Sequence, residues 1–267
     1  MPLEEIINRQ GIIISAPASG AGKTTVTLGL INAFARKRSV QPFKSGPDYI
    51  DSKFQSVAAD RPSYNLDTWA MSSSDILNMI GMVGPSDICI AEGSMGLFDG
   101  VISKGAGGNG STADLASITN WPVILVVDCA KQAQSVAALI TGFNSFRHDI
   151  TIGGVILNNI SSKRHEALVV SEVSKTKVPI LGVIPRSNEL TIPERHLGLV
   201  QAEDLSDLEQ LIFKLGTLIE ENCDLEAIAC TARNSFPPIS TLQKITPPAQ
   251  RIAIARDNAF TFTYSHL

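Results

Sequence analysis

The chain has 267 residues, which is enough for one domain with a buried core and a short additional segment. Hydrophobic residues make up 44% and charged residues 18%, and the formal net charge is −4 with no basic block and no acidic run. This balance excludes nucleic acid and anionic membrane as expected partners and is typical of a soluble globular protein.

Apolar runs alternate with segments of helical period along most of the chain. The runs rich in β-branched residues are 11–16, 40–43, 87–91, 122–127, 152–157 and 178–183. Helical spacing is found in 23–38, 76–83 and 206–221, with a polar loop expected between 43 and 76. Continuous apolar runs indicate strands covered on both faces. The pattern therefore predicts an α/β fold with a doubly wound parallel sheet, helices on both faces and right-handed crossovers.

The first predicted strand is followed by a glycine-rich turn that opens the first predicted helix. The turn and its flanks are Ser19, Gly20, Ala21, Gly22, Lys23, Thr24 and Thr25. In this position such a loop binds the phosphates of ATP through its backbone N–H groups. Lys23 is then expected to neutralise the β- and γ-phosphates, and the Thr24 hydroxyl to bind Mg²⁺. The strict motif has a glycine five places before Gly22, where this chain has Pro17.

Two carboxylates and a lysine follow the second predicted strand, in the segment 44–51. Ligands of open α/β sheets bind at the carboxyl ends of the strands, so Lys44, Asp48 and Asp51 are expected to face the nucleotide. Asp48 suits Mg²⁺, either directly or through water, and Asp51 suits substrate or metal. The alternative interpretation is a loop in which aspartates only cap a helix.

The run 88–91 ends in Glu92, at the position of a carboxylate that holds the metal beside a phosphate loop. Asp99 follows in the same glycine-rich segment and is a candidate on the substrate side. Residues 111–114 (Ser-Thr-Ala-Asp) are expected to cap a helix at the same rim, and for Asp114 capping and catalysis both remain open.

The last third of the chain carries weaker signals. Arg195 is a candidate anion contact because its planar guanidinium group can donate two hydrogen bonds to a carboxylate or phosphate. His196 is interpreted as an ordinary hydrogen-bonded loop histidine. Residues 231–250 contain two Pro-Pro pairs and are predicted to form a linker. Residues 251–255 are predicted to be the first strand of a second domain. The expected organisation is therefore a nucleotide-binding domain over 1–230, a linker over 231–250 and the start of another domain over 251–267.

The four cysteines show no metal-ligand spacing, and Cys89 and Cys129 lie in apolar runs that predict buried thiols. The chain begins without a charged and then apolar signal segment, and no apolar run is long enough to span a bilayer. We therefore expect a cytoplasmic protein in a reducing compartment.

The chain resembles the cobyrinic (hydrogenobyrinic) acid a,c-diamide synthases of cobalamin biosynthesis. The resemblance extends from residue 12 to about residue 200 and is carried by 16–25, 41–51, 65–67, 92–100, 111–114, 154–158 and 193–199. It implies a P-loop NTPase-like fold of the dethiobiotin synthetase type, with Pro17 as a normal part of the loop. It also implies catalytic duties for Lys23, Asp48, Asp51, Glu92 and Asp99, with Thr24, Asp48 and Glu92 at the metal.

The resemblance implies a reaction with two steps. ATP phosphorylates the a- and c-acetate carboxylates of a corrinoid, and ammonia then displaces phosphate from each acyl phosphate. In this family ammonia comes from glutamine through a C-terminal glutaminase domain with a cysteine nucleophile. Residues 251–264 resemble the first strand of that domain, and no cysteine lies in this segment. We therefore expect a missing or separate glutaminase.

Several alternatives stay open from the sequence. The enzyme could act on the terminal amides of corrinoids or on a nickel tetrapyrrole, as in nickel-sirohydrochlorin a,c-diamide synthase. A second alternative is an ATPase switch of the partition type, although Ala18 and Ser19 stand where that class often carries an additional lysine. A third is an inactive truncated remnant. A homodimer is also left open.

Overall fold

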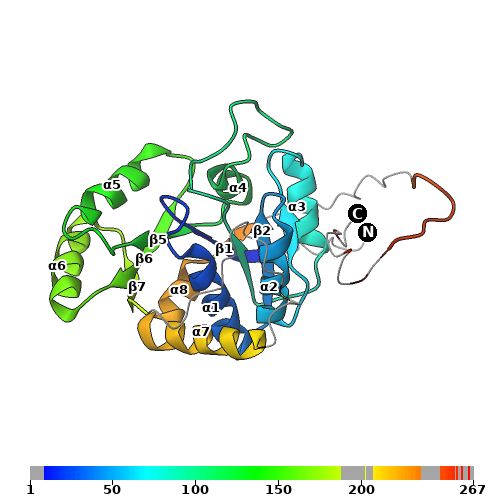
Figure 1. Ribbon diagram of the computed structural model, residues 1–267. Coiled ribbons are helices and arrows are strands. Elements are labelled where there is room, and N and C mark those ends of the chain that lie inside the picture. Colours follow the sequence, from blue (N-terminus) through cyan, green and yellow to red (C-terminus); the bar gives the residue numbers. More distant parts are fainter. Residues whose placement is uncertain are drawn as a thin grey trace, which may run out of the picture.

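The computed structural model describes residues 9–187, 202, 207–235, 247–255, 257, 260 and 264. A mixed sheet runs through the middle of the molecule (Figure 1), and its strands are β1 (Arg9–Ser15), β2 (Val40–Ser45), β3 (Tyr64–Leu66), β4 (Ile88–Glu92), β5 (Val123–Asp128), β6 (Ile152–Ile160), β7 (Ile180–Pro185) and β8 (Arg233–Ser235). Strands β1 to β7 are parallel in the order β3-β2-β4-β1-β5-β6-β7, and β8 pairs antiparallel with the start of β1.

Helices cover both faces of this sheet (Figure 1). One face carries α1 (Lys23–Ala35), α2 (Tyr49–Ala59), α7 (Leu208–Asn222) and α8 (Leu225–Thr231). The other carries α3 (Ser73–Met82), α4 (Thr112–Thr119), α5 (Val136–Phe146) and α6 (Lys163–Val173), with a 3₁₀ turn η1 (Ser174–Thr176) after α6. The central strands are buried on both sides because each face has its own apolar core. The predicted α/β fold class is confirmed.

The loop predicted between residues 43 and 76 is wrong in its middle, because α2 and β3 lie there. Helix α2 begins after Asp48, whose side chain accepts a hydrogen bond from the Asp51 amide, and it buries Phe54 and Ala58 on the sheet. Its apolar residues Ile50, Phe54, Val57 and Ala58 are spaced as on one face of a helix, a period that the prediction overlooked among the polar residues of this segment. The Asp48 cap and the two buried apolar side chains hold the helix against the larger apolar core.

The region after α7 also differs in detail from the expectation. Residues 233–235, within the expected linker, form β8 on β1. Residues 251–255 are exposed and form no strand, although a strand was predicted there. Their backbone groups have no strand beside them in the described chain, and an unpaired strand gains no ladder hydrogen bonds. Among the helices that the structure describes, none has both the length and the apolar character needed to cross a bilayer.

Strands β2, β4 and β1 are neighbours in the middle of the sheet, and because they are parallel their carboxyl ends lie on the same side. In the strand register Glu92 of β4 lies beside Ile14 of β1 and beside Lys44 of β2. Parallel sheets bind their ligands at this side. The residues that follow these three strands in the sequence are therefore neighbours in space.

Candidate functional site

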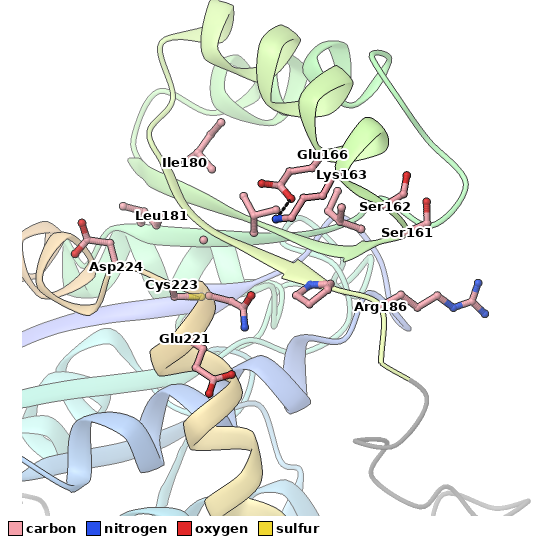
Figure 2. A pocket seen from close by; sticks show the side chains of 15 residues that line it. Ser161, Ser162, Lys163, Glu166, Ile180, Leu181, Arg186, Glu221, Cys223 and Asp224 are labelled. Atoms are coloured by element: carbon pink, nitrogen blue, oxygen red, sulfur yellow. Dashed lines mark hydrogen bonds and ion pairs between the residues drawn. The ribbon is translucent and has the colours of Figure 1, made fainter.

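A cavity of about 710 Å³ runs along the edge strand β7 (Figure 2). Its lining comes from β7, from the start of α6 and from the end of α7, with Lys163, Arg186 and Cys223 among its side chains. None of the lining residues belongs to the phosphate loop or to the acidic residues predicted from the sequence. The residues predicted from the sequence lie instead at the ends of the central strands β1, β2 and β4. Arg195 and His196 lie outside the described residues.

The phosphate loop joins β1 to α1, and its last residue, Gly22, is the N-cap of α1 with a φ of 85°. This left-handed conformation favours glycine. The side-chain amide of Asn158, at the end of β6, donates to the carbonyl oxygen of Ala21 at 3.0 Å. A Cβ atom on Gly22 would lie 2.3 Å from the same amide nitrogen, so glycine also allows this close approach. The loop is thereby held at the N-terminus of a helix, where backbone N–H groups bind anions.

The side chains of Lys23 and Thr24, at the start of α1, contact the end of β4 and the segment that follows it. Lys23 donates from Nζ to the carbonyl oxygen of Met95 at 3.0 Å, and burial lowers the pKa of its ammonium. The Thr24 hydroxyl donates to Oε1 of Glu92 at 2.7 Å. The main chain of Leu97 donates to the carbonyl oxygen of Ala16 at 2.8 Å, which packs the segment after β4 against the phosphate loop.

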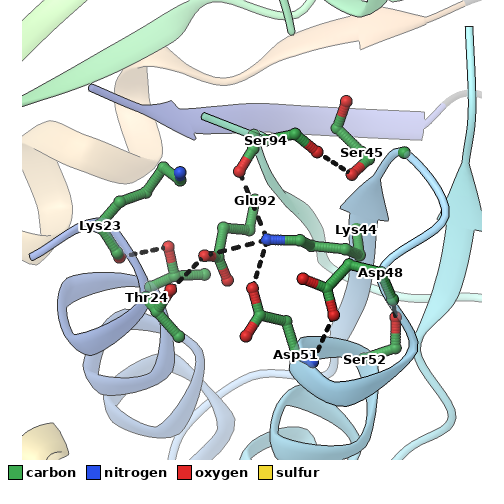
Figure 3. A network of polar contacts seen from close by, with 12 residues as sticks. Lys23, Thr24, Lys44, Ser45, Asp48, Asp51, Ser52, Glu92 and Ser94 are labelled. Carbon is green, nitrogen blue, oxygen red and sulfur yellow. Dashed lines mark hydrogen bonds and ion pairs between the residues drawn. The ribbon is translucent and has the colours of Figure 1, made fainter. Parts of the chain in front are cut away.

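Glu92 lies at the centre of a polar network, and its side chain is completely buried (Figure 3). Its Oε1 accepts from Thr24 and lies 3.3 Å from Nζ of Lys44, and its Oε2 accepts from Nε2 of Gln55 at 2.8 Å. Burial raises the pKa of the Glu92 carboxyl, because the charged form loses its water there, while Lys44 acts in the opposite direction. A buried carboxylate remains charged only where such partners compensate it.

Lys44 lies between Glu92 and Asp51 and is only 3% exposed (Figure 3). Its Nζ also approaches the carbonyl oxygen of Gly93 at 3.4 Å. Burial acts to lower the pKa of Lys44, but the Glu92 and Asp51 carboxylates outweigh burial and raise it well above its ordinary value. Lys44 is therefore a buried cation with two carboxylate partners.

Asp48 is the N-cap of α2, as in the alternative interpretation of this segment. Its Oδ1 accepts from the Asp51 amide at 3.0 Å, and its carbonyl oxygen accepts from Nδ2 of Asn65 at 2.8 Å. The cap turns Asp51 towards Lys44. Capping does not exclude a contact with metal or substrate, so the role predicted for Asp48 stays a prediction.

The other two acidic candidates also have structural partners. The Gly96 amide donates to Oδ2 of Asp99 at 2.8 Å, which closes the turn that follows the Lys23 contact. Asp114 accepts from the Asn109 amide and forms an ion pair with Arg147 at 2.9 Å, while Ser111 caps α4 as predicted. Asp114 is therefore engaged in holding the loop before α4, and nothing in its contacts indicates catalysis.

The structure joins Thr24, Asp51 and Glu92 into one network through Lys44, with Asp48 attached through the helix cap. Lys23 lies outside this network of direct contacts and donates to the Met95 carbonyl oxygen. Sequence reasoning did not assign Gln55 or the pairing of Lys44. Gln55 lies in the middle of a helix that the sequence did not predict, so no local signal marks it. Asn158 ends the segment 154–158, one of those that carry the family resemblance, and this is its only signal in the sequence.

The donor set fits Mg²⁺ bound together with nucleotide. The Thr24 hydroxyl and the Glu92 carboxylate are adjacent hard oxygen donors beside the phosphate loop. The described residues contain no cluster of three or more His, Cys, Asp or Glu side chains that could hold a metal by themselves. Mg²⁺ usually has only a few protein ligands, because it keeps several waters and takes its other ligands from phosphates.

Comparison with known proteins agrees with this geometry. The family model of the CobQ/CobB/MinD/ParA nucleotide binding domain matches residues 12–200. The chain is 45% identical over 259 residues to hydrogenobyrinate a,c-diamide synthase of Rhodobacter capsulatus and 46% identical over 261 residues to that of a Sinorhizobium species. These alignments cover 97% and 96% of this chain but 59% of each relative. They confirm the resemblance to the diamide synthase family, and the chain spans about three fifths of the length of these relatives.

Among solved structures, the MinC:MinD cell division protein complex of Aquifex aeolicus is 15% identical with a TM-score of 0.48. That alignment covers 79% of this chain and 96% of the other.

Proposed function

The chain belongs to the CobQ/CobB/MinD/ParA nucleotide binding domain family, and we propose that it is the ATP-dependent amide synthetase part of a corrinoid a,c-diamide synthase. The observation that carries this proposal is the convergence of Thr24, Lys44 and Gln55 on Glu92, directly beside the phosphate loop. The second support is the identity of about 45% to hydrogenobyrinate a,c-diamide synthases, which covers nearly the whole chain.

The proposed reaction transfers the γ-phosphoryl group of ATP to a carboxylate of the corrinoid. A carboxylate oxygen forms a bond to phosphorus, the bond to the β,γ-bridging oxygen breaks, and ADP leaves. Ammonia then attacks the acyl carbon, and phosphate leaves with the former carboxylate oxygen to give the amide. Each amidation therefore consumes one ATP, and the a- and c-acetates are modified separately.

Electrostatics explain why such a site needs lysines. The carboxylate and the γ-phosphate are both anions, and bringing them together requires positive charge at the transferring group. Lys23 at the phosphate loop supplies one such charge in the proposed site. Thr24 and Glu92 would hold Mg²⁺, which neutralises phosphate oxygens when it is bound.

The acidic residues near the loop have separate proposed duties. Asp48 and Asp51 at the start of α2 would contact metal-bound water or the substrate, and Asp99 would face the substrate from the segment after β4. In the structure each of the three also has a partner within the chain. We infer that these contacts hold the carboxylates in place before substrate enters.

Ammonia is the proposed nitrogen donor for the part of the enzyme represented by this chain. In the proposal a glutaminase supplies ammonia from glutamine, either as a further domain or as a separate protein. Free ammonia at alkaline pH can reach an acyl phosphate without that partner. Closure of the site against water would still affect the yield, because acyl phosphates hydrolyse.

The test is to incubate the chain with Mg·ATP and ammonium, with and without cobyrinic acid or hydrogenobyrinic acid. Phosphate release and the mass of the corrinoid are then measured. We expect ATP turnover that depends on the corrinoid, and a corrinoid product carrying one and then two amides. ATP turnover that is indifferent to corrinoid would instead support a switch ATPase. Amidation of a nickel tetrapyrrole in preference to either corrinoid would instead support a nickel-sirohydrochlorin a,c-diamide synthase.

A further inference from the structure

Glu92 is held in one orientation by two neutral donors on different elements. Thr24 of α1 donates to Oε1 at 2.7 Å, and Gln55 of α2 donates to Oε2 at 2.8 Å. Gln55 is itself fixed, because its Oε1 accepts from the Ser63 hydroxyl at 2.8 Å and its side chain is fully buried. Rotation of the Glu92 carboxylate would break at least one of these buried hydrogen bonds.

Lys44 already occupies the cationic position beside this fixed carboxylate. Its Nζ lies 3.3 Å from Oε1 of Glu92, which is the oxygen that also accepts from Thr24. The same ammonium is ion-paired with Asp51, and the lysine is 3% exposed. The two carboxylates and Lys44 together carry one net negative charge. A divalent cation placed among them would leave one net positive charge in a site with little access to water.

We propose that Lys44 is an internal counter-cation that keeps free divalent metal away from Glu92 and Asp51 until nucleotide phosphates are present. The proposal deepens the proposed function, because it assumes that the neighbouring loop binds phosphates. A second cation near Lys44 is repelled strongly where water is scarce. The phosphate groups of a nucleotide bring several negative charges to the same place, and they offset this repulsion. Metal then enters as the metal–nucleotide complex and not as the free ion.

The direct test replaces Lys44 with methionine, which has a similar shape and no charge. Binding of Mn²⁺ or Mg²⁺ is measured by calorimetry without nucleotide at pH 8, and thermal unfolding is followed with and without the metal. We expect K44M to bind the free metal at least about ten-fold more tightly than the native chain. We also expect its unfolding temperature to be low without metal, because Glu92 loses its partner, and to rise on addition of metal. The native chain should show little change with free metal.

Two further variants keep the test interpretable. In the double variant Lys44→Met with Glu92→Gln, both charges are removed, so the chain should fold without metal and gain no stability from it. This variant shows whether a poorly folded K44M fails because Glu92 is left uncompensated. Lys37→Met is the control, since Lys37 is 70% exposed and lies near Glu220, away from the carboxylates of the site. We expect K37M to leave the binding of free metal within about two-fold of the native value.

The proposal is overturned if K44M binds free metal no more tightly than the native chain and its unfolding temperature does not respond to metal. It is also overturned if the native chain binds free Mg²⁺ as tightly as K44M does. Nucleotide binding by the native chain is measured in parallel. Absence of nucleotide binding would count against the proposed function, whereas the free-metal titration judges the role of Lys44 by itself.

Discussion

The side-chain amide of Asn158 donates to the carbonyl oxygen of Ala21 at 3.0 Å and so ties the end of β6 to the phosphate loop, 137 residues earlier in the chain. Asn158 is 8% exposed, so this hydrogen bond is largely shielded from water. The carbonyl oxygen of Ala21 therefore already has a hydrogen-bond donor within the chain. The amides of the loop are left to face an anion.

Replacing Asn158 with leucine should weaken nucleotide binding, because the loop loses a buried hydrogen bond of about 1 kcal/mol, which corresponds to roughly five-fold in affinity. Calorimetry with Mg·ATP measures the loss. Asn159→Gly is the matched control: its φ of 60° suits glycine, and its amide donates to Asp128 at 2.8 Å and not to the loop. Equal losses in the two variants would contradict a specific role for Asn158.

Lys23→Ala should abolish ATP binding and leave the chain folded. The lysine is half-buried and makes one hydrogen bond, to the Met95 carbonyl oxygen, so its removal should cost about 1 kcal/mol of stability or less. Thermal unfolding and calorimetry with Mg·ATP test the two halves of the prediction. Lys37→Ala provides the control, because that side chain is 70% exposed and lies near Glu220, away from the loop. Unchanged affinity in folded K23A would refute the phosphate-loop assignment.

Glu92→Gln should raise the Mg²⁺ concentration needed for turnover far more than it changes the affinity for nucleotide. The amide removes a negative charge from the proposed metal position, while the backbone N–H groups that hold much of the nucleotide are unaffected. The measurement is corrinoid-dependent phosphate release over a Mg²⁺ series, with nucleotide affinity determined separately. Full activity of E92Q at low Mg²⁺ would show that Glu92 is not a metal ligand.

Two substitutions of Asp48 separate its role as the N-cap of α2 from its proposed role as a ligand of metal or substrate. Asparagine is as good an N-cap as aspartate, so Asp48→Asn should leave thermal stability nearly unchanged, whereas Asp48→Ala should lose about 1 kcal/mol. If the carboxylate serves metal or substrate, both variants should lose turnover to a similar extent. Activity retained in D48N and lost only in D48A would mean that Asp48 acts as a helix cap alone.

The thiols should differ widely in reactivity with pH. Burial raises the pKa of Cys89 to about 11 and that of Cys129 and Cys223 to about 12, whereas Cys230 is exposed. At pH 8 the thiolate form of Cys89 is therefore only roughly one part in a thousand. Iodoacetamide on the folded chain should modify Cys230 first, and all four cysteines should react in urea. Peptide mass spectrometry decides this, and fast modification of native Cys89 or Cys129 would contradict their burial.

The sequence by itself determined the fold class, the phosphate loop and the strand-end acid Glu92. These features rest on local patterns: continuous apolar runs of strand length, a glycine-rich turn before a helix, and an acid at the end of a buried run. Helix α2 was missed although its apolar residues have helical spacing, and the core on which Phe54 and Ala58 pack is not contained in a short window of sequence.

Only the tertiary structure decided how the charges are paired. Lys44 and Glu92 are 48 residues apart in the sequence, yet they are neighbours in the register of two parallel strands. Gln55 reaches Glu92 from a helix on one face of the sheet, and Asn158 reaches the phosphate loop from a strand two places away from β1. Parallel strands bring distant segments side by side, so the partners of a buried charge are set by the order and register of the strands. The local sequence shows that an acid, Glu92, ends a buried strand, and the strand order of the sheet determines that Lys44 is its cationic partner.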